Sequence, residues 1–265
     1  MKQWLIVMAV GAGLSSSALA GMVHLNPDAA AVAKTPDSTV AAMRYRVSNT
    51  NWDQMIATGS DVGYGTIVQN SNIGNHSALN GATWDFTVAY TPFGGFAFTL
   101  QRPGTSSTVS WAAPAFGLSP TRSYNALHLQ VETGANMPGN IAAASVAVSD
   151  LAFVGTRMDS AGTLRPLSAA WSNSGPSEPA APEAREQWIV ATDDLAETSW
   201  TLTGKVTASF AYRPGFSQPG GNLDERLKFD VRALSANVIA VPEPGSVLLG
   251  LIALPLLGLG RRGLR

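Results

Sequence analysis

The sequence predicts an all-β protein: an antiparallel, jelly-roll-like β-sandwich flanked by an N-terminal signal peptide and a short C-terminal membrane helix. Three observations lead to this prediction. Between the two ends, apolar residues alternate with polar ones at a period of two, which is the period of a half-buried strand. Clusters of Gly and Pro interrupt the alternating runs, as turns do in a sandwich. An uncharged apolar stretch lies close to each end of the chain.

The first twenty residues have the form of a secretory signal peptide. Lys2 supplies a positive charge, residues 4–14 are apolar, and the small residues Ala18 and Ala20 follow. The apolar stretch is too short to cross about 30 Å of hydrocarbon, and Ala-x-Ala is typical of a cleavage site. We therefore predict that residues 1–20 are removed by cleavage after Ala20.

Residues 21–240 are predicted to form one sandwich domain of roughly eight to ten strands. The clearest strand runs from Ser199 to Tyr212, where an apolar side that begins with Trp200 alternates with a Thr/Ser side. This pattern is typical of a strand with one face in the core and one in water. Further alternating runs cover residues 84–90, 96–100, 127–131, 146–153, 188–190 and 227–234.

Two details of these runs predict local structure. Pro92 and Gly94-Gly95 separate residues 84–90 from residues 96–100, which indicates a hairpin. The phase of the alternation changes across Ser149-Asp150, which indicates a β-bulge or a tight turn.

Helix signals are weak throughout the body. Residues 28–46 are rich in Ala at their start and are predicted to contain one short helix, and residues 51–56 a single helical turn. Residues 168–186 contain three Pro and are predicted to form a long surface loop. No internal repeat of fixed period is visible, so neither a propeller nor a β-helix is expected.

Composition excludes several classes of function. The chain of 265 residues has no Cys, which rules out disulfides, thiolate metal sites and a cysteine nucleophile. Its formal net charge is −1, and residues 21–240 contain 13 basic and 17 acidic residues, a net charge of −4. Because no basic surplus exists to neutralise phosphates, we expect no nucleic-acid partner.

Residues that often carry catalysis are scattered along the chain. His24, His76 and His128 lie far apart and are each predicted to be surface histidines, and no familiar catalytic or metal-binding motif occurs. A catalytic triad assembled across the fold stays open, because triads are defined by geometry and not by spacing. We predict no catalytic residue, and hence a protein that is not an enzyme.

Three carboxylates are candidate metal ligands. Asp224 and Glu225 follow a Gly-Gly-Asn turn, and Asp150 stands at the predicted bulge. Turns rich in oxygen ligands hold Ca²⁺ in many proteins, but Asp and Asn are also ordinary turn formers in solvent. No cofactor is predicted, and Ca²⁺ is the one alternative that these residues leave open.

The seven tryptophans divide into two groups. Trp84 and Trp200 lie on apolar strand faces and are predicted to be core residues. Trp52, Trp111 and Trp171 lie in segments without clear alternation. Exposed on loops, they would stack on sugar rings; the alternative is that each packs beneath its own loop.

The C-terminal residues 241–265 have three parts. Pro242-Glu243-Pro244 comes first, the uncharged apolar segment 247–260 follows, and Arg261, Arg262 and Arg265 end the chain. A helix of fourteen residues is roughly 21 Å long, which is marginal for spanning a bilayer. The arginines favour the cytoplasmic side. These properties predict a weak and transient anchor in the inner membrane.

These three parts, in this order, resemble the PEP-CTERM sorting signal of Gram-negative bacteria that make exopolysaccharide. The resemblance implies that Pro242, Glu243 and Pro244 are recognised by an exosortase, a membrane transpeptidase-like enzyme that removes the anchor near the motif. Two residues beyond Arg262 depart from the family pattern, although Arg265 keeps the end basic. The body is also similar, through looser patterns such as residues 148–153 and 200–204, to the choice-of-anchor domains that precede such signals.

The expected function is therefore that of an exported, non-catalytic surface or extracellular-matrix protein. The resemblance implies a transient anchor in the inner membrane, processing by exosortase, and release to the cell surface or the biofilm matrix beside exopolysaccharide. The alternative is a carbohydrate-binding or carbohydrate-active sandwich, because a fold does not fix a function.

Overall fold

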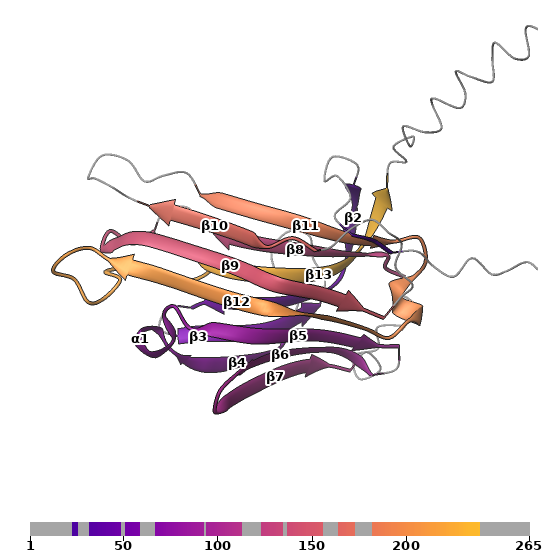
Figure 1. Cartoon of the computed structure of the whole chain (residues 1–265), viewed down its shortest axis with the longest axis horizontal. Coiled ribbons are helices and arrows are strands. Elements are labelled where there is room, and N and C mark those ends of the chain that lie inside the picture. The colour runs from indigo at the N-terminus through magenta and orange to yellow at the C-terminus, as the bar shows by residue number, and fades with distance from the viewer. Residues whose placement is uncertain are drawn as a thin grey trace, which may run out of the picture.

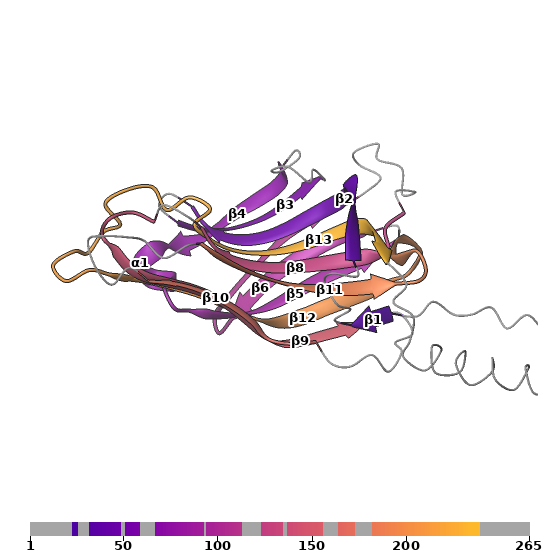
Figure 2. The same cartoon turned by 90° about the horizontal axis from the view of Figure 1, so that it is seen from above.

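Two antiparallel sheets packed face to face make up the described part of the protein (Figures 1 and 2). The computed structural model describes residues 23–25, 32–48, 51–58, 67–92, 94–112, 123–134, 137–155, 164–172 and 182–238. Within these ranges the chain is nearly all strand, with one short helix, α1 (His76–Leu79), and a single 3-10 turn at Leu195–Glu197. The sequence-based prediction of an all-β sandwich is confirmed at this level.

The first sheet has seven strands. In spatial order they are β1 (Val23–Leu25), β11 (Glu183–Ala191), β8 (Ala126–Thr133), β13 (Leu227–Val238), β2 (Val32–Val47), β3 (Asn51–Thr58) and β4 (Ile67–Asn75). The last described strand, β13, lies in the middle of this sheet and pairs with β8 on one side and β2 on the other.

The second sheet has six strands. In spatial order they are β10 (Leu167–Ser172), β9 (Ile141–Val154), β12 (Trp200–Tyr212), β5 (Thr83–Thr91), β6 (Gly95–Arg102) and β7 (Thr105–Trp111). The midline of this sheet therefore runs between β12 and β5.

Strands with one apolar side were predicted correctly. The hairpin of β5 and β6 is present, and Trp200, Leu202 and Val206 of β12 are buried as their alternation predicts. The bulge is present as well: two residues of β9, Asp150 and Leu151, stand opposite the single residue Gly204. Asp150 adopts the left-handed conformation there, with φ 52°.

The described parts of both predicted helical segments are strands, and so are the two ends of the predicted loop. Residues 28–46 overlap β2 and residues 51–56 belong to β3. The alternation of apolar and polar residues is not visible in β3, because the polar residue Gln54 takes a buried position. There it donates a hydrogen bond to the carbonyl of Phe98. The two ends of segment 168–186 belong to β10 and β11, and residues 173–181 lie outside the described residues.

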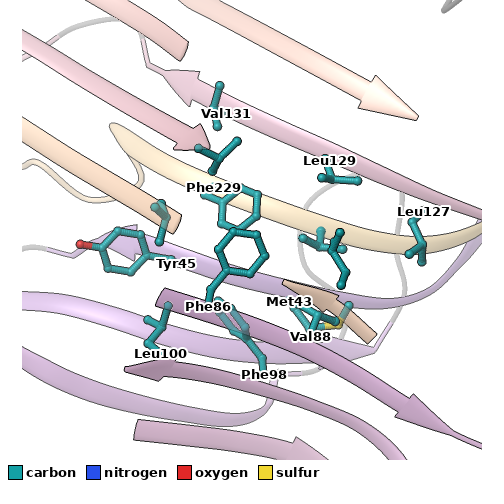
Figure 3. Close-up of a cluster of buried hydrophobic side chains, with 14 of the residues drawn as sticks. Met43, Tyr45, Phe86, Val88, Phe98, Leu100, Leu127, Leu129, Val131 and Phe229 are labelled. Atoms are coloured by element: carbon teal, nitrogen blue, oxygen red, sulfur yellow. The ribbon is translucent and has the colours of Figure 1, made fainter. Parts of the chain in front are cut away.

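The core lies between the two sheets (Figure 3). Phe86 of the six-stranded sheet packs on Phe229 of the seven-stranded sheet, with ring centroids 4.8 Å apart. Side chains from both sheets surround this contact: Met43, Tyr45, Val88, Phe98, Leu100, Leu127, Leu129 and Val131. Described residues from Val23 to Ala233, drawn from both sheets, share this one core, which is the arrangement expected of a single folded unit.

Strand β1 and the end of β13 lie at the same end of the sandwich. The register aligns His24 of β1 with Val190, then Ala126, then Leu234 of β13 across the seven-stranded sheet. Helix α1 and the turn between β12 and β13 lie at the opposite end (Figure 1). No described helix has the length and apolar character needed to cross a membrane.

Candidate functional site

The residues assigned to export and sorting lie beyond the two ends of the body. Ala18 and Ala20 precede β1, and Pro242, Glu243 and Pro244 follow β13. The basic residues Arg261, Arg262 and Arg265 end the chain. All of these residues lie outside the described residues.

The three tryptophans proposed for sugar stacking are buried, so this hypothesis is wrong for all of them. Trp52, Trp111 and Trp171 have relative exposures of 0%, 2% and 2%. Each lies on a strand, in β3, β7 and β10 respectively. Trp52 stacks between Tyr45 and Phe210, with centroid distances of 5.3 Å and 6.2 Å. A ring enclosed in this way offers no face to a ligand.

Trp111 and Trp171 are enclosed by the same sandwich. The Trp111 ring stacks on Phe96 at 5.9 Å, and Trp171 stands opposite Ala144 of β9. Both belong to the main cluster of buried side chains. Their burial supports the core and leaves no exposed aromatic platform at these positions.

The three candidate metal ligands are distributed over the two sheets. Asp150 belongs to the six-stranded sheet, where its Oδ2 lies 2.5 Å from Nζ of Lys205. Asp224 and Glu225 precede β13 in the other sheet, and Glu225 accepts a hydrogen bond of 2.6 Å from Arg46. Among the described residues, no group of three or more acidic or histidine side chains is arranged to hold a metal ion. Each carboxylate instead faces a cationic side chain.

Two of the histidines are buried, contrary to the expectation that they face solvent. His128 of β8 is 1% exposed, its ring stacks on Trp188 at 4.3 Å, and its Nε2 lies 2.8 Å from Glu186. His76 of α1 is 8% exposed, and its Nε2 lies 2.9 Å from the carbonyl oxygen of Ser48. Both rings contribute to packing and to hydrogen bonding.

The outward side of the seven-stranded sheet carries most of the ionic contacts of the body, and we call it the charged face. Because Met43 and Tyr45 point into the core, Arg44 and Arg46 point outward from β2, and the register brings Asp230 of β13 opposite Arg44. The charged face consists of Arg44, Arg46, Asp53, His128, Glu132, Glu186, Lys228, Asp230 and Arg232, with Asp224 and Glu225 at its rim.

A buried ion pair lies at the centre of the charged face. Nε and Nη2 of Arg44 both donate to the Asp230 carboxylate, the second at 2.6 Å. The two residues are 2% and 1% exposed. Burial lowers the pKa of the Arg44 guanidinium, while Asp230 and Glu225 act against that shift. The alternation of residues 227–234 places Asp230 on the outward side of the sheet, where it is buried and not in solvent.

The charges around this pair compensate one another. Arg232 approaches Asp230 at 3.3 Å, and Lys228 pairs with Glu132 at 3.0 Å. Such a network fixes the position of β13 between β8 and β2. Because the arginines and the lysine of this face each contact a carboxylate, this arrangement is suited to holding strands together.

The outward side of the six-stranded sheet has a different character, and we call it the hydroxyl face. One row crosses four strands as Thr203, Thr87, Thr99 and Thr108. Its other positions are mainly Ser, Thr and Ala, including Thr83, Ala89, Ala97, Ser110, Ser145, Ala152, Val154, Thr201, Thr207 and Ser209. The described strands place only three charged side chains on it: Asp85, Asp150 and Lys205.

Several hydroxyl groups of this face bond to each other across strands. The oxygen atoms of Thr83 and Thr207 lie 2.7 Å apart, and those of Thr99 and Thr108 lie 2.9 Å apart. Ser145 and Ser209 make a third such pair at 2.9 Å. No aromatic side chain points outward from the described strands here, so this face has nothing on which a sugar ring can stack.

The described residues form hollows at the surface, two of which lie beside the strands discussed above. One, of about 380 Å³, lies at the β9–β10–β12 end of the hydroxyl face. Its lining consists of Ser and Ala residues together with Trp171 and Phe210, whose side chains are buried. The other, of about 370 Å³, lies beside β1 and includes His24, Asn125 and Asn237. Neither lining contains a carboxylate, so neither has the pair of acidic groups that most glycosidases use.

No protein-family model matches the chain, and no curated protein is significantly similar to it.

Proposed function

We propose that the protein is a non-catalytic, exported protein of a Gram-negative bacterium, which an exosortase sorts to the cell surface or the extracellular matrix. There it associates with exopolysaccharide. One observation carries the proposal: the order of Pro242-Glu243-Pro244, the uncharged segment 247–260 and the terminal arginines.

The described strands lie close to both assigned signals. The first described strand begins at Val23, three residues after Ala20, and the last ends at Val238, four residues before Pro242. Since β13 is a central strand, a segment that leaves from it is tethered to the whole sheet.

The carbohydrate-binding alternative has lost its main support. It relied on exposed aromatic rings, and Trp52, Trp111 and Trp171 are all in the core. We therefore favour the sorting proposal alone.

Replacement of Pro242-Glu243-Pro244 by three alanines in the producing organism tests the proposal. We expect the variant to keep its C-terminal segment and to accumulate in the membrane fraction, while the wild-type protein is processed and released. Immunoblotting of membrane, surface and medium fractions, together with the intact mass of the released protein, measures both effects.

Ser177-Glu178-Pro179 is a matched control, because it also contains a Glu-Pro pair but lacks the apolar segment and basic end that follow the C-terminal motif. Its replacement by three alanines should leave processing unchanged. Normal processing and release of the variant at 242–244 would overturn the sorting proposal.

A further inference from the structure

We propose that the hydroxyl face is a self-association surface, on which two copies of the chain pack face to face. The inference comes from the described strands alone and does not depend on the sorting route. The twofold axis that we propose lies in the interface, runs along the strands and passes between β12 and β5, the midline of the six-stranded sheet.

The charges at the centre of the face are self-complementary. Lys205 of β12 and Asp85 of β5 are direct cross-strand neighbours on either side of the midline, and both are exposed. In a twofold interface each contact occurs twice with its partners exchanged. The proposed axis therefore places Lys205 of each copy over Asp85 of the other, which forms two equivalent ion pairs.

The sizes of the neighbouring side chains match under the same axis. The axis places each cross-strand row of residues in one copy over the same row in the other copy. Thr203 of one copy therefore lies over Thr87 of the other, and Thr201 lies over Ala89. One strand farther out, Val154 lies over Ala97 and Thr99 lies over Ala152. Val154 is 69% exposed, so this arrangement covers a large apolar side chain with a small one.

The low bulk and low charge of the face allow this approach. Sheets pack about 10 Å apart when their side chains interlock, and Ser, Thr and Ala do not prevent this. The hydroxyl pairs 83–207, 99–108 and 145–209 already have partners within one chain. Covering these three pairs therefore leaves their hydroxyl groups with a hydrogen bond.

The area of the face is sufficient for a specific dimer. Six strands about 4.8 Å apart, each with about seven residues at about 3.4 Å, cover about 700 Å² per copy. Stable interfaces of standard size bury about 600–1,000 Å² per partner, and the whole face lies within this range. Packed sheets are rotated by about 30° relative to each other. The side chains of the two copies therefore match best over the four central strands, where the paired side chains lie.

A charged polymer is a poorer occupant for this face. The three charged side chains of the hydroxyl face are one lysine and two aspartates, and Lys205 already contacts Asp150. A polyanion would find no unmatched cation among them. A second copy, in contrast, supplies both signs of charge at the required positions.

Sedimentation velocity of residues 21–240 over a concentration series tests the proposal. Asp150→Asn serves as the parent, because it removes the competing intramolecular partner of Lys205 and Asn tolerates the left-handed conformation. We expect a monomer–dimer equilibrium in both the wild type and this parent. In the parent background, Asp85→Lys or Lys205→Asp alone places like charges over each other and should weaken the dimer at least about tenfold.

The double reversal Asp85→Lys with Lys205→Asp restores opposite charges and should return the dimerisation constant to that of the parent. Arg185→Asp reverses an exposed charge on the other sheet and should leave the dimer unchanged. Thr203→Arg, made without any charge reversal, should also abolish the dimer by its bulk. Circular dichroism and thermal unfolding check that each variant is folded.

Each alternative result would overturn the inference. These results are a wild type that is monomeric at all concentrations, a dimer that tolerates both single reversals, and a double reversal that does not recover. A folded monomeric wild type that binds a neutral polysaccharide through Thr203 would assign the face to that ligand instead.

Discussion

The two outward faces of the sandwich differ in both charge and burial. On the charged face, Arg44 and Asp230 are long, charged and almost completely buried. On the hydroxyl face, Thr203 and Thr87 are short, uncharged and partly accessible, and Asp85 and Lys205 are exposed. Both faces arise from the same alternation over one core. A polar position on a strand therefore either stabilises the fold or stays accessible to a partner, depending on which residue stands opposite it.

The charged face stabilises the strand from which the C-terminal segment leaves. Strand β13 runs from Leu227 to Val238, and the Arg44–Asp230 pair joins it to β2 near the start of the body. In the proposed sorting route the membrane anchor follows directly after this strand. The ion pair therefore joins the last described strand to β2 across the centre of one sheet.

Asp230→Ala should have the largest effect among the substitutions that test this comparison. It leaves Arg44 buried without its main partner, and breaking such a pair typically costs about 3–5 kcal/mol. Urea unfolding of residues 21–240 measures the loss. The double variant Arg44→Met with Asp230→Leu removes both charges and should recover most of that stability, since apolar replacements of buried ion pairs are often neutral.

Asp85→Ala is the matched control on the hydroxyl face. Asp85 is an exposed strand carboxylate, and its removal should change the monomer's free energy of unfolding by less than about 0.5 kcal/mol. If Asp85→Ala and Asp230→Ala lower the free energy of unfolding by the same amount, the two faces do not differ in the way that their burial indicates.

Sequence patterns predicted those parts of the fold in which neighbours along the chain decide the structure. Trp200, Leu202 and Val206 alternate with polar residues, and β12 follows that pattern. The phase change at Asp150 predicted the bulge. In β10, by contrast, Trp171 is preceded by Ser and Ala, which differ too little in polarity to show a period, and a buried ring was taken for a loop residue.

The burial of Asp230 had no local signal. Its partner Arg44 is 186 positions away in the sequence, and only the register of β13 on β2 brings the two together. The hydroxyl face had a partial signal in the Thr/Ser side of residues 199–212. Its row of threonines nevertheless depends on the pairing of four strands, which one segment alone does not specify.

Glu225→Gln should have an intermediate effect. The Glu225 side chain is 38% exposed, and it contacts Arg46 at 2.6 Å and Arg44 at 3.5 Å. Ion pairs at this level of exposure contribute at most about 1 kcal/mol, so we expect a loss between those of Asp230→Ala and Asp85→Ala. Raising the salt concentration should shrink the difference from the wild type. A loss of stability as large as that of Asp230→Ala would mean that the rim of the charged face stabilises the fold as strongly as its centre does.

The smallest effect is expected for the pair Thr99→Val and Thr108→Val on the hydroxyl face. The two hydroxyl oxygens lie 2.9 Å apart in an exposed position, where water replaces the lost hydrogen bond. Val also suits a strand as well as Thr does. The monomer should therefore keep its free energy of unfolding within about 0.5 kcal/mol. A loss above about 1 kcal/mol, measured by the same urea unfolding at low protein concentration, would mean that the hydroxyl rows stabilise the sheet. The hydroxyl face would then stabilise the fold as the charged face does. Its low charge would in that case be explained without a second copy of the chain.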